Sequence, residues 1–178
     1  MSLSARPLVR SRTLKSVSSS LKKSSAPTRS RKQNTRRKAA FLTRYAEPEI
    51  TESSQGVEMF LPVRLPGFNE AIAASKTGRG RFNRYARDKE EIQTVLCLML
   101  KTLGLRRFDK CRIGFTWVEP DRKRDIDNIS AGKKYILDSL VSLGVLKDDS
   151  WKYVKGFLPE FFEADKNNWG VRVRIEEV

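Results

Sequence analysis

The chain has 178 residues, of which 36 are Lys or Arg, 21 are Asp or Glu and none is His, so its formal net charge is +15. The absence of histidine excludes an imidazole base, a Ser-His-Asp triad and a His-ligated zinc or iron site. The two cysteines, Cys97 and Cys111, have no metal-ligand spacing and are interpreted as reduced core residues. Because no apolar run reaches the roughly 18 residues of a membrane helix and no secretory signal follows the basic start, we expect a soluble, cytoplasmic protein.

The positive charge is concentrated at the N-terminus. Residues 1–45 contain 13 basic and no acidic residues, whereas residues 46–178 contain 23 basic and 21 acidic residues. A segment so rich in Ser, Lys and Arg cannot bury enough apolar surface to offset its ordering entropy, so residues 1–54 are predicted to form a disordered basic extension. Three interpretations of it stay open: a non-specific DNA-binding arm, a solubilising extension and an organelle-targeting peptide.

The folded domain is predicted to cover residues 55–178 and to begin with a strand over 57–63, in which Pro62 indicates an edge position or a strand end. A turn over residues 65–70 and a basic loop through Arg81 follow, and this loop lacks the Gly-Lys-Ser/Thr ending of a phosphate-binding P-loop. Apolar residues at helical spacing then predict a helix over 82–103, which Gly104 ends.

Strands and helices are also predicted to alternate in the second half of the chain. A strand is predicted over 111–119 and closes at Pro120. A helix is predicted over 128–143, with Asp127 or Asn128 as its N-cap and Gly144 as its breaker. Two strands over 151–158 and 171–177 complete the order β-α-β-α-β-β, which is typical of a small α/β domain with a mixed sheet.

Acidic pairs flank the second predicted helix. On an extended backbone Asp125 and Asp127 would leave the same face and could share one cation. Asp148-Asp149 could return to them at the far end of the helix. Hard oxygen ligands of this kind suit Mg²⁺ or Mn²⁺, ions that assist phosphate chemistry. In a basic protein, the expected phosphate is that of a nucleic acid.

Four short motifs resemble, in order and spacing, those of the RusA family of Holliday-junction resolvases: residues 124–129 (Arg-Asp-Ile-Asp-Asn-Ile), Lys134, residues 138–140 (Asp-Ser-Leu) and residues 148–149 (Asp-Asp). The resemblance covers residues 57–178 and is most specific between 122 and 154. It implies a RusA-like fold and a homodimeric, Mg²⁺-dependent endonuclease that nicks four-way DNA junctions symmetrically in recombination and repair. Such an enzyme would be cytoplasmic and of bacterial or phage origin.

The resemblance also implies residue roles. Asp125, Asp127 and Asp149 match metal-binding aspartates, with Mn²⁺ able to replace Mg²⁺, and Lys134 matches a catalytic lysine. The interval from Asp127 to Asp138 is longer here than in the best-known member of the family, so Lys133 stays an alternative. Helix geometry favours Lys134, because an aspartate four residues later could orient it, although such a pair is also a common structural salt bridge.

Several exposed-type residues around these motifs are predicted to contact DNA, the basic ones through its phosphates, with a solvated surface as the alternative. They are Phe68, Asn69, Arg79, Arg81, Arg84, Arg122, Lys123 and Arg124. Among the aromatic residues, Phe68 is the candidate for insertion at a junction, whereas the three tryptophans are interpreted as core or dimer-interface residues: Trp117, Trp151 and Trp169. Two other functions stay open: a non-catalytic nucleic-acid-binding protein that acts through its tail, and a metal-dependent nuclease for another branched DNA or for RNA.

Overall fold

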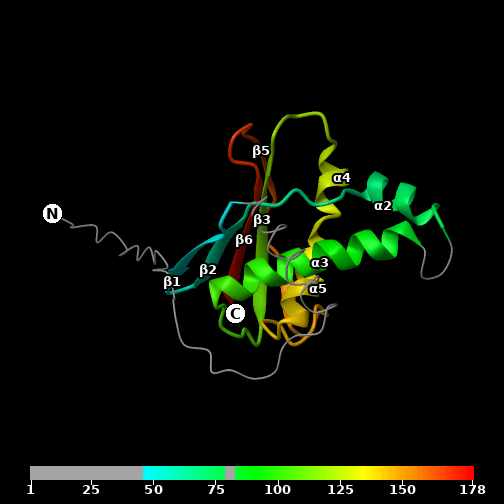
Figure 1. Cartoon of the computed structure of the whole chain (residues 1–178). Coiled ribbons are helices and arrows are strands. Elements are labelled where there is room, and N and C mark those ends of the chain that lie inside the picture. The colour runs from blue at the N-terminus through cyan, green and yellow to red at the C-terminus, as the bar shows by residue number, and fades with distance from the viewer. Residues whose placement is uncertain (1–45, 79–82) are drawn as a thin grey trace, which may run out of the picture.

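A computed structural model describes residues 46–78 and 83–178 of the chain. Its centre is a six-stranded mixed sheet (Figure 1). The strands are β1 (Glu49–Ser53), β2 (Gly56–Leu61), β3 (Cys111–Glu119), β4 (Val154–Phe157), β5 (Phe161–Ala164) and β6 (Gly170–Glu177). The predictions for residues 1–45 and for Arg79 and Arg81 lie outside the described residues.

The strand order is β1-β2-β6-β3-β4, and β5 also pairs with β3. Strand β6 is antiparallel to both β2 and β3, whereas β4 and β5 are parallel to β3. The two parallel strands share one edge of the sheet, with Val154 of β4 opposite Cys111 and Phe161 of β5 opposite Thr116. The mixed α/β architecture predicted from the sequence is therefore confirmed.

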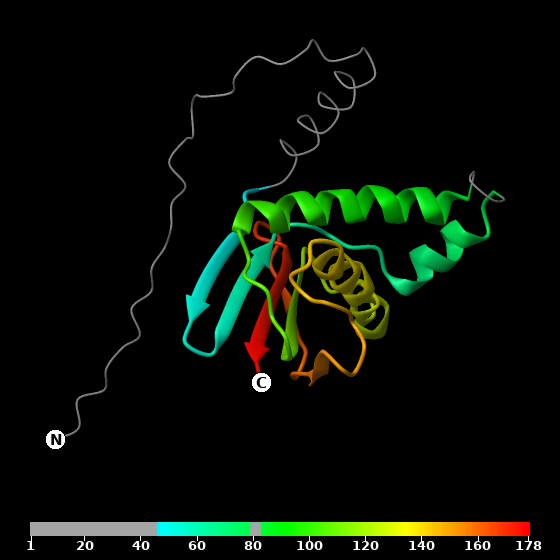
Figure 2. The same cartoon turned by 90° about the horizontal axis from the view of Figure 1, so that it is seen from below.

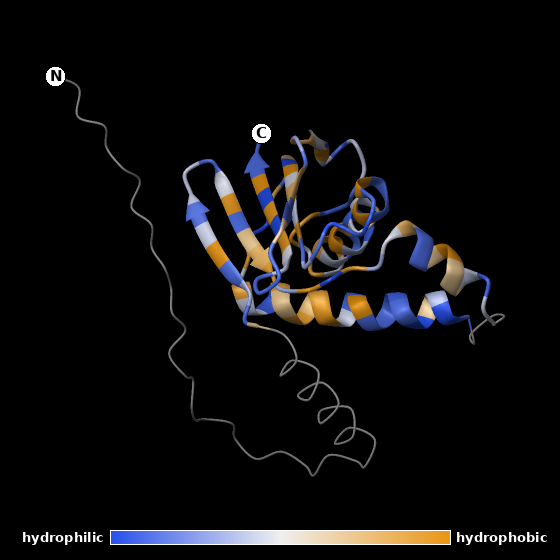
Figure 3. Ribbon diagram, turned by 90° about the horizontal axis from the view of Figure 1, so that it is seen from above, coloured by the Kyte–Doolittle hydropathy of each residue, from blue (hydrophilic) through white to orange (hydrophobic). Residues whose placement is uncertain are grey.

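Two helices cover the apolar face of the sheet, α3 (Arg84–Leu103) and α5 (Lys133–Ser142) (Figure 2). Residues alternate along the strands, so that Val171, Val173 and Ile175 of β6 are fully buried beneath these helices. The C-terminal half of α3 is hydrophobic where it crosses the sheet, and its N-terminal half is hydrophilic where it projects beside α2 (Phe68–Ser75) (Figure 3). Helix α3 ends at Gly104, as predicted, with a left-handed φ of 62°.

Three elements were not predicted: β1, α2 and β5. Strand β1 pairs with β2 from Glu49 to Ser53, so the sheet begins before residue 55, where the sequence had placed the start of the domain. Both β1 and β5 are mostly exposed and carry no apolar alternation, which explains why the pattern gave no signal. The N-terminus of α2 is capped by a residue that is distant in the sequence: the side-chain oxygen of Asn128 accepts the backbone N–H of Asn69 at 2.9 Å.

The helix predicted over 128–143 is two helices, α4 (Ile126–Ser130) and α5. Gly132 lies between them against the Trp117 ring, where an added Cβ would be 2.9 Å from the ring. The N-cap of α4 is Asp125, not Asp127 or Asn128. The expectation that Asp125 and Asp127 leave one face of an extended strand is therefore wrong, because only the first has an extended backbone and the second lies in the first helical turn.

Both cysteines are free, as expected. Burial raises the pKa of the Cys111 thiol to about 11, and the nearby charge of Glu177 adds to this shift. Among the helices that the structure describes, none combines the length and the apolarity that crossing a membrane requires.

Candidate active site

Lys134 joins two motifs that are separated along the chain. Its ammonium Nζ lies 2.7 Å from Asp138 Oδ1, one helical turn further along α5, and 2.8 Å from Asp149 Oδ2, in the loop after α5. Lys89 of α3 contacts the other oxygen of Asp138 at 2.9 Å. The hydrogen bond with Asp138, and then that with Asp149, raises the pKa of Lys134 above its ordinary value, so this lysine is fully protonated at neutral pH.

Asp125 and Asp127 lie at the start of α4 with exposed side chains. Within residues 46–78 and 83–178, neither carboxylate has a salt bridge or a side-chain hydrogen bond. The same part of the chain contains no group of three His, Cys, Asp or Glu side chains placed to hold a metal ion. The structure therefore brings Asp149 to Lys134 but does not gather Asp149 with the other two aspartates.

The carboxylate oxygens of Asp125, Asp127 and Asp149 are suitable ligands for Mg²⁺, but the three side chains are not gathered around one point in the described structure. Asp125 and Asp127 offer free carboxylate oxygens, the ligand type that Mg²⁺ prefers. The third predicted ligand, Asp149, is neutralised by an ammonium group instead. The resemblance to the RusA family assigns the ion to Asp125, Asp127 and Asp149, and in the structure Lys134 already occupies the last of these carboxylates.

Lys133, the alternative lysine, has a different environment. Its Nζ lies 2.8 Å from Glu160 Oε2, and the other oxygen of Glu160 accepts the Trp117 indole N–H at 2.7 Å. The side chain of Lys133 is 25% exposed and that of Lys134 is 59% exposed. Lys133 therefore ties α5 to the segment between β4 and β5, while Lys134 is the lysine that faces Asp149.

Arg124 was predicted to contact DNA, but its side chain is only 9% exposed. Its guanidinium donates to Glu119 at 2.7 Å, to Glu70 at 3.2 Å and to the Leu65 carbonyl at 3.2 Å. Arg64 makes a second ion pair with Glu119 at 3.0 Å. The structure thus places Arg124 in an internal charge network that connects the end of β3 to the segment before α2, and does not present it to a ligand.

The partners of Arg124 are the residues that the sequence reasoning missed. Glu70 and Leu65 lie 54 and 59 residues from Arg124 along the chain, and Glu119 lies at the end of β3, so sequence spacing alone could not connect these partners with Arg124. One signal was available: Glu119 is a charged residue within an apolar strand, and a buried carboxylate requires a cationic partner.

The other predicted DNA contacts that the structure describes lie on the surface. Phe68 is 57% exposed at the start of α2, where the side chain of Asn69 is also exposed. Arg84 begins α3 and pairs with Asp88 at 3.3 Å, with its side chain 68% exposed. Arg122 is exposed, and Lys123 pairs with Asp121 at 3.1 Å. These residues are available to a ligand, in contrast to Arg124.

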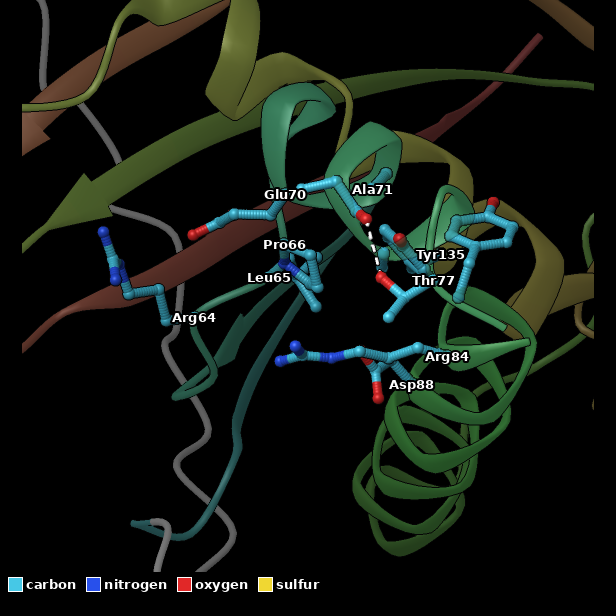
Figure 4. A pocket seen from close by; sticks show the side chains of 12 residues that line it. Arg64, Leu65, Pro66, Glu70, Ala71, Thr77, Arg84, Asp88 and Tyr135 are labelled. Carbon is cyan, nitrogen blue, oxygen red and sulfur yellow. Dashed lines mark hydrogen bonds and ion pairs between the residues drawn. The ribbon is translucent and has the colours of Figure 1, made fainter. Parts of the chain in front are cut away.

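Two hollows lie beside the candidate site. The larger, about 600 Å³, is lined among others by Arg64, Arg84 and Tyr135 of α5, and Tyr135 lies at the end away from Arg64 (Figure 4). The smaller, about 330 Å³, shares Tyr85 and Tyr135 with it and includes Lys134. Burial, followed by the influence of Tyr85 and nearby carboxylates, raises the pKa of Tyr135 to about 12, so its hydroxyl stays protonated at neutral pH.

Comparison with known proteins assigns no family. No protein-family model matches the chain, and no curated protein matches it at significant similarity. The resemblance to the RusA family therefore rests on the motif residues themselves, and function has to be argued from the geometry of those residues.

Proposed function

We propose that this chain is a Mg²⁺-dependent, structure-selective DNA endonuclease with a RusA-like fold that resolves four-way junctions by paired symmetric nicks. The observation that carries the proposal is the 2.8 Å contact between Lys134 and Asp149. These residues are the catalytic lysine and one metal-binding aspartate that the resemblance implies, and they are 15 positions apart in the sequence. Their direct contact supports the view that the two motifs form one site.

The chemistry of phosphodiester hydrolysis fits this set of side chains. A bound Mg²⁺ would supply charge neutralisation at the phosphate and an activated water. The chain contributes the free carboxylates of Asp125 and Asp127 toward that ion. Lys134 remains charged at neutral pH and can donate to a phosphoryl or leaving oxygen, where negative charge increases in the transition state. Asp138, itself held by Lys89, keeps the ammonium in place.

Symmetric incision of a four-armed substrate requires two copies of this site. A two-fold homodimer supplies them, and its symmetry matches that of the substrate. The exposed side chains of Phe68, Arg84, Arg122 and Lys123 are available for contacts with the DNA arms. Phosphate contacts from the three basic side chains would position the duplex without reading its sequence.

The proposal is tested by a cleavage panel of four-way junction, flap, duplex and single-stranded DNA with Mg²⁺, Mn²⁺ or EDTA. We expect paired nicks in the junction that need the divalent ion. Asp127→Asn should abolish cutting, because it removes the charge of a proposed metal ligand. It should leave junction binding intact, because the side chain is exposed and the change adds no negative charge. Cutting by Asp127→Asn at the normal rate would refute the assigned site.

The two adjacent lysines provide a matched pair of variants. Lys134→Met should slow cutting by about 10²- to 10³-fold, the usual effect of removing one donor to a developing oxyanion. Lys133→Met should retain cutting, because that side chain pairs with Glu160. Thermal unfolding of both variants provides the control for folding. If Lys133→Met is the inactive variant and Lys134→Met cuts normally, the lysine assignment is reversed.

A non-catalytic nucleic-acid-binding protein is the second candidate function. It is favoured by the 13 basic residues within positions 1–45 and by the lack of a three-ligand metal group in the described part of the chain. Removal of residues 1–45 separates the two functions. The nuclease should keep divalent-ion-dependent cutting, whereas a binder that acts through its tail should lose nearly all affinity and most of its salt dependence. Cutting of flaps or RNA with junctions left intact would identify a nuclease for another substrate.

A further inference from the structure

Trp151 is the most exposed large hydrophobic residue in the described part of the chain, with 91% of its surface accessible. The sequence had placed all three tryptophans in the core or in a dimer interface. Trp117 is indeed 3% exposed and Trp169 is half-buried. The indole of Trp151 packs against little of its own chain, and tryptophan is enriched at binding interfaces because it combines a large apolar ring with an N–H donor.

The turn that carries Trp151 is held by several hydrogen bonds. The backbone N–H groups of Tyr153 and Val154 both donate to the Ser150 carbonyl at 2.9 Å. The ring of Tyr153 is buried, and the backbone carbonyl of the same residue accepts the N–H of Cys111 at the start of β3. Lys155 Nζ donates to the Trp151 carbonyl at 3.2 Å. These hydrogen bonds restrain the backbone that carries the indole, and a restrained backbone has less freedom to lose on binding.

The backbone of this turn lies beside Asp149 of the candidate active site. Trp151 follows Asp149 by two residues, so their Cα atoms are within about 7 Å of each other. Asp149 in turn contacts Lys134. A group that stacks on the indole therefore lies close to the phosphate that the proposed site would cut.

Three exposed lysines surround Trp151 in sequence: Lys147, Lys152 and Lys155. The ammonium groups of Lys147 and Lys152 lie 5.7 and 5.5 Å from the centre of the Tyr153 ring, so both side chains cross the same buried tyrosine. An exposed aromatic ring between basic residues is the arrangement that binds unstacked bases and their phosphates. A protein interface is disfavoured here, because lysine is depleted at such interfaces.

We propose that Trp151 is a stacking platform for an unpaired or unstacked base of branched DNA beside the cleaved phosphate, with Lys147 and Lys152 contacting the flanking phosphates. This inference rests on the proposed function for the identity of its substrate. The branch point is the part of such a substrate where base faces are accessible, whereas a continuous duplex covers them by stacking. The platform therefore adds affinity for branched DNA over duplex DNA.

Binding measurements with the full chain in EDTA, where metal-dependent cutting stops, test this proposal. Trp151→Ala should weaken binding of a four-way junction by about 5- to 150-fold, the range measured for loss of one base-stacking contact, and should change duplex binding little. Trp151→Phe should retain most of the affinity. Phe161→Ala is the matched control, because this residue is also an exposed aromatic, at 60%, but lies on β5 at the sheet edge.

Salt dependence separates stacking from charge. Trp151→Ala should leave the slope of log Kd against log salt unchanged, whereas Lys152→Ala should reduce that slope by about 1 and weaken junction and duplex binding equally. Equal loss of junction and duplex affinity in Trp151→Ala would overturn the proposal. So would weaker self-association of that variant with unchanged DNA affinity, which would make Trp151 a dimer contact.

Fluorescence provides a readout that does not depend on cutting. The signal of Trp151, obtained by subtracting the spectrum of Trp151→Phe, should become protected from acrylamide when junction DNA binds. Protection in a protein that cuts no DNA would support the platform and refute the nuclease. Asp127-dependent cutting together with an unprotected Trp151 would refute the platform and support the nuclease.

Discussion

Replacement of Arg124 by methionine is the strongest test of the charge network at the end of β3. The variant removes a guanidinium that is 9% exposed and donates to Glu119, to Glu70 and to the Leu65 carbonyl. Breaking a buried ion pair costs about 3–5 kcal/mol when the partner is left without a counter-charge. Here Glu119 keeps Arg64 at 3.0 Å and Glu70 is exposed to water, so we expect a loss of about 2–4 kcal/mol in unfolding free energy.

The matched control is Arg106→Met. Arg106 contacts Glu177 at 2.8 Å, close to the 2.7 Å between Arg124 and Glu119, but the side chains of Arg106 and Glu177 are 54% and 47% exposed. An exposed pair of this kind contributes about 0–1 kcal/mol. Urea unfolding of both variants, followed by circular dichroism at neutral pH, measures the difference directly.

Equal losses of stability in the two variants would refute the reasoning, because Arg124 is more buried and has more polar partners than Arg106. A second result would restore the prediction made from the sequence. If Arg124→Met unfolds like the unmodified protein but reduces the salt slope of junction binding by about 1, Arg124 contacts a DNA phosphate after all.

Three further predictions concern single groups. Burial alone would raise the pKa of Asp138, but hydrogen bonding with Lys134 outweighs burial and lowers that pKa. The carboxylate of Asp138 therefore stabilises the fold above the unfolded pKa of about 3.9, and this stabilisation is lost as pH falls through the lower folded pKa. Urea midpoints measured from pH 7 to pH 3 should accordingly fall more steeply in the unmodified protein than in Asp138→Asn, and parallel curves would contradict this. Cys111 should resist a thiol reagent at pH 8 until the protein unfolds, since it is buried and its pKa is about 11. If Cys111 in the native protein reacted as fast as an unprotected thiol, its burial would be disproved. Gly67→Ala should lower the unfolding free energy by about 1–3 kcal/mol, because a Cβ there would collide with the Asn128 side chain, and a neutral effect in urea unfolding would exclude that close approach.

The elements that could be predicted from the sequence are those with long hydrophobic patterns. Strand β3 occupies residues 111–119 and α3 occupies 84–103, both close to their predicted ranges. In each, enough apolar residues recur at one period to identify the buried face. Strands β1 and β5 could not be predicted in this way, since they join the sheet through backbone pairing and expose most of their side chains.

The candidate site was predictable only where a local rule applied. The pair of Lys134 with Asp138 follows from helical spacing, and it is present. The common face of Asp125 and Asp127 assumed a strand, and a helix of five residues is too short for its period to show in the sequence. Arg122, Lys123 and Arg124 look alike as three consecutive basic residues, and only the folded chain distinguishes the buried one from the exposed two.

The rotation of α5 decides which lysine reaches Asp149, and residues outside the acidic motifs set that rotation. Trp117 packs against Gly132 and donates its indole N–H to Glu160, and the same carboxylate binds Lys133. Successive residues of an α-helix point about 100° apart. With Lys133 fixed toward Glu160, the next side chain is turned away from the sheet edge and toward the loop that contains Asp149. Ile136 and Leu140 of α5 are fully buried and fix the same rotation, so Lys134 should still face Asp149 when the pair of Lys133 with Glu160 is removed.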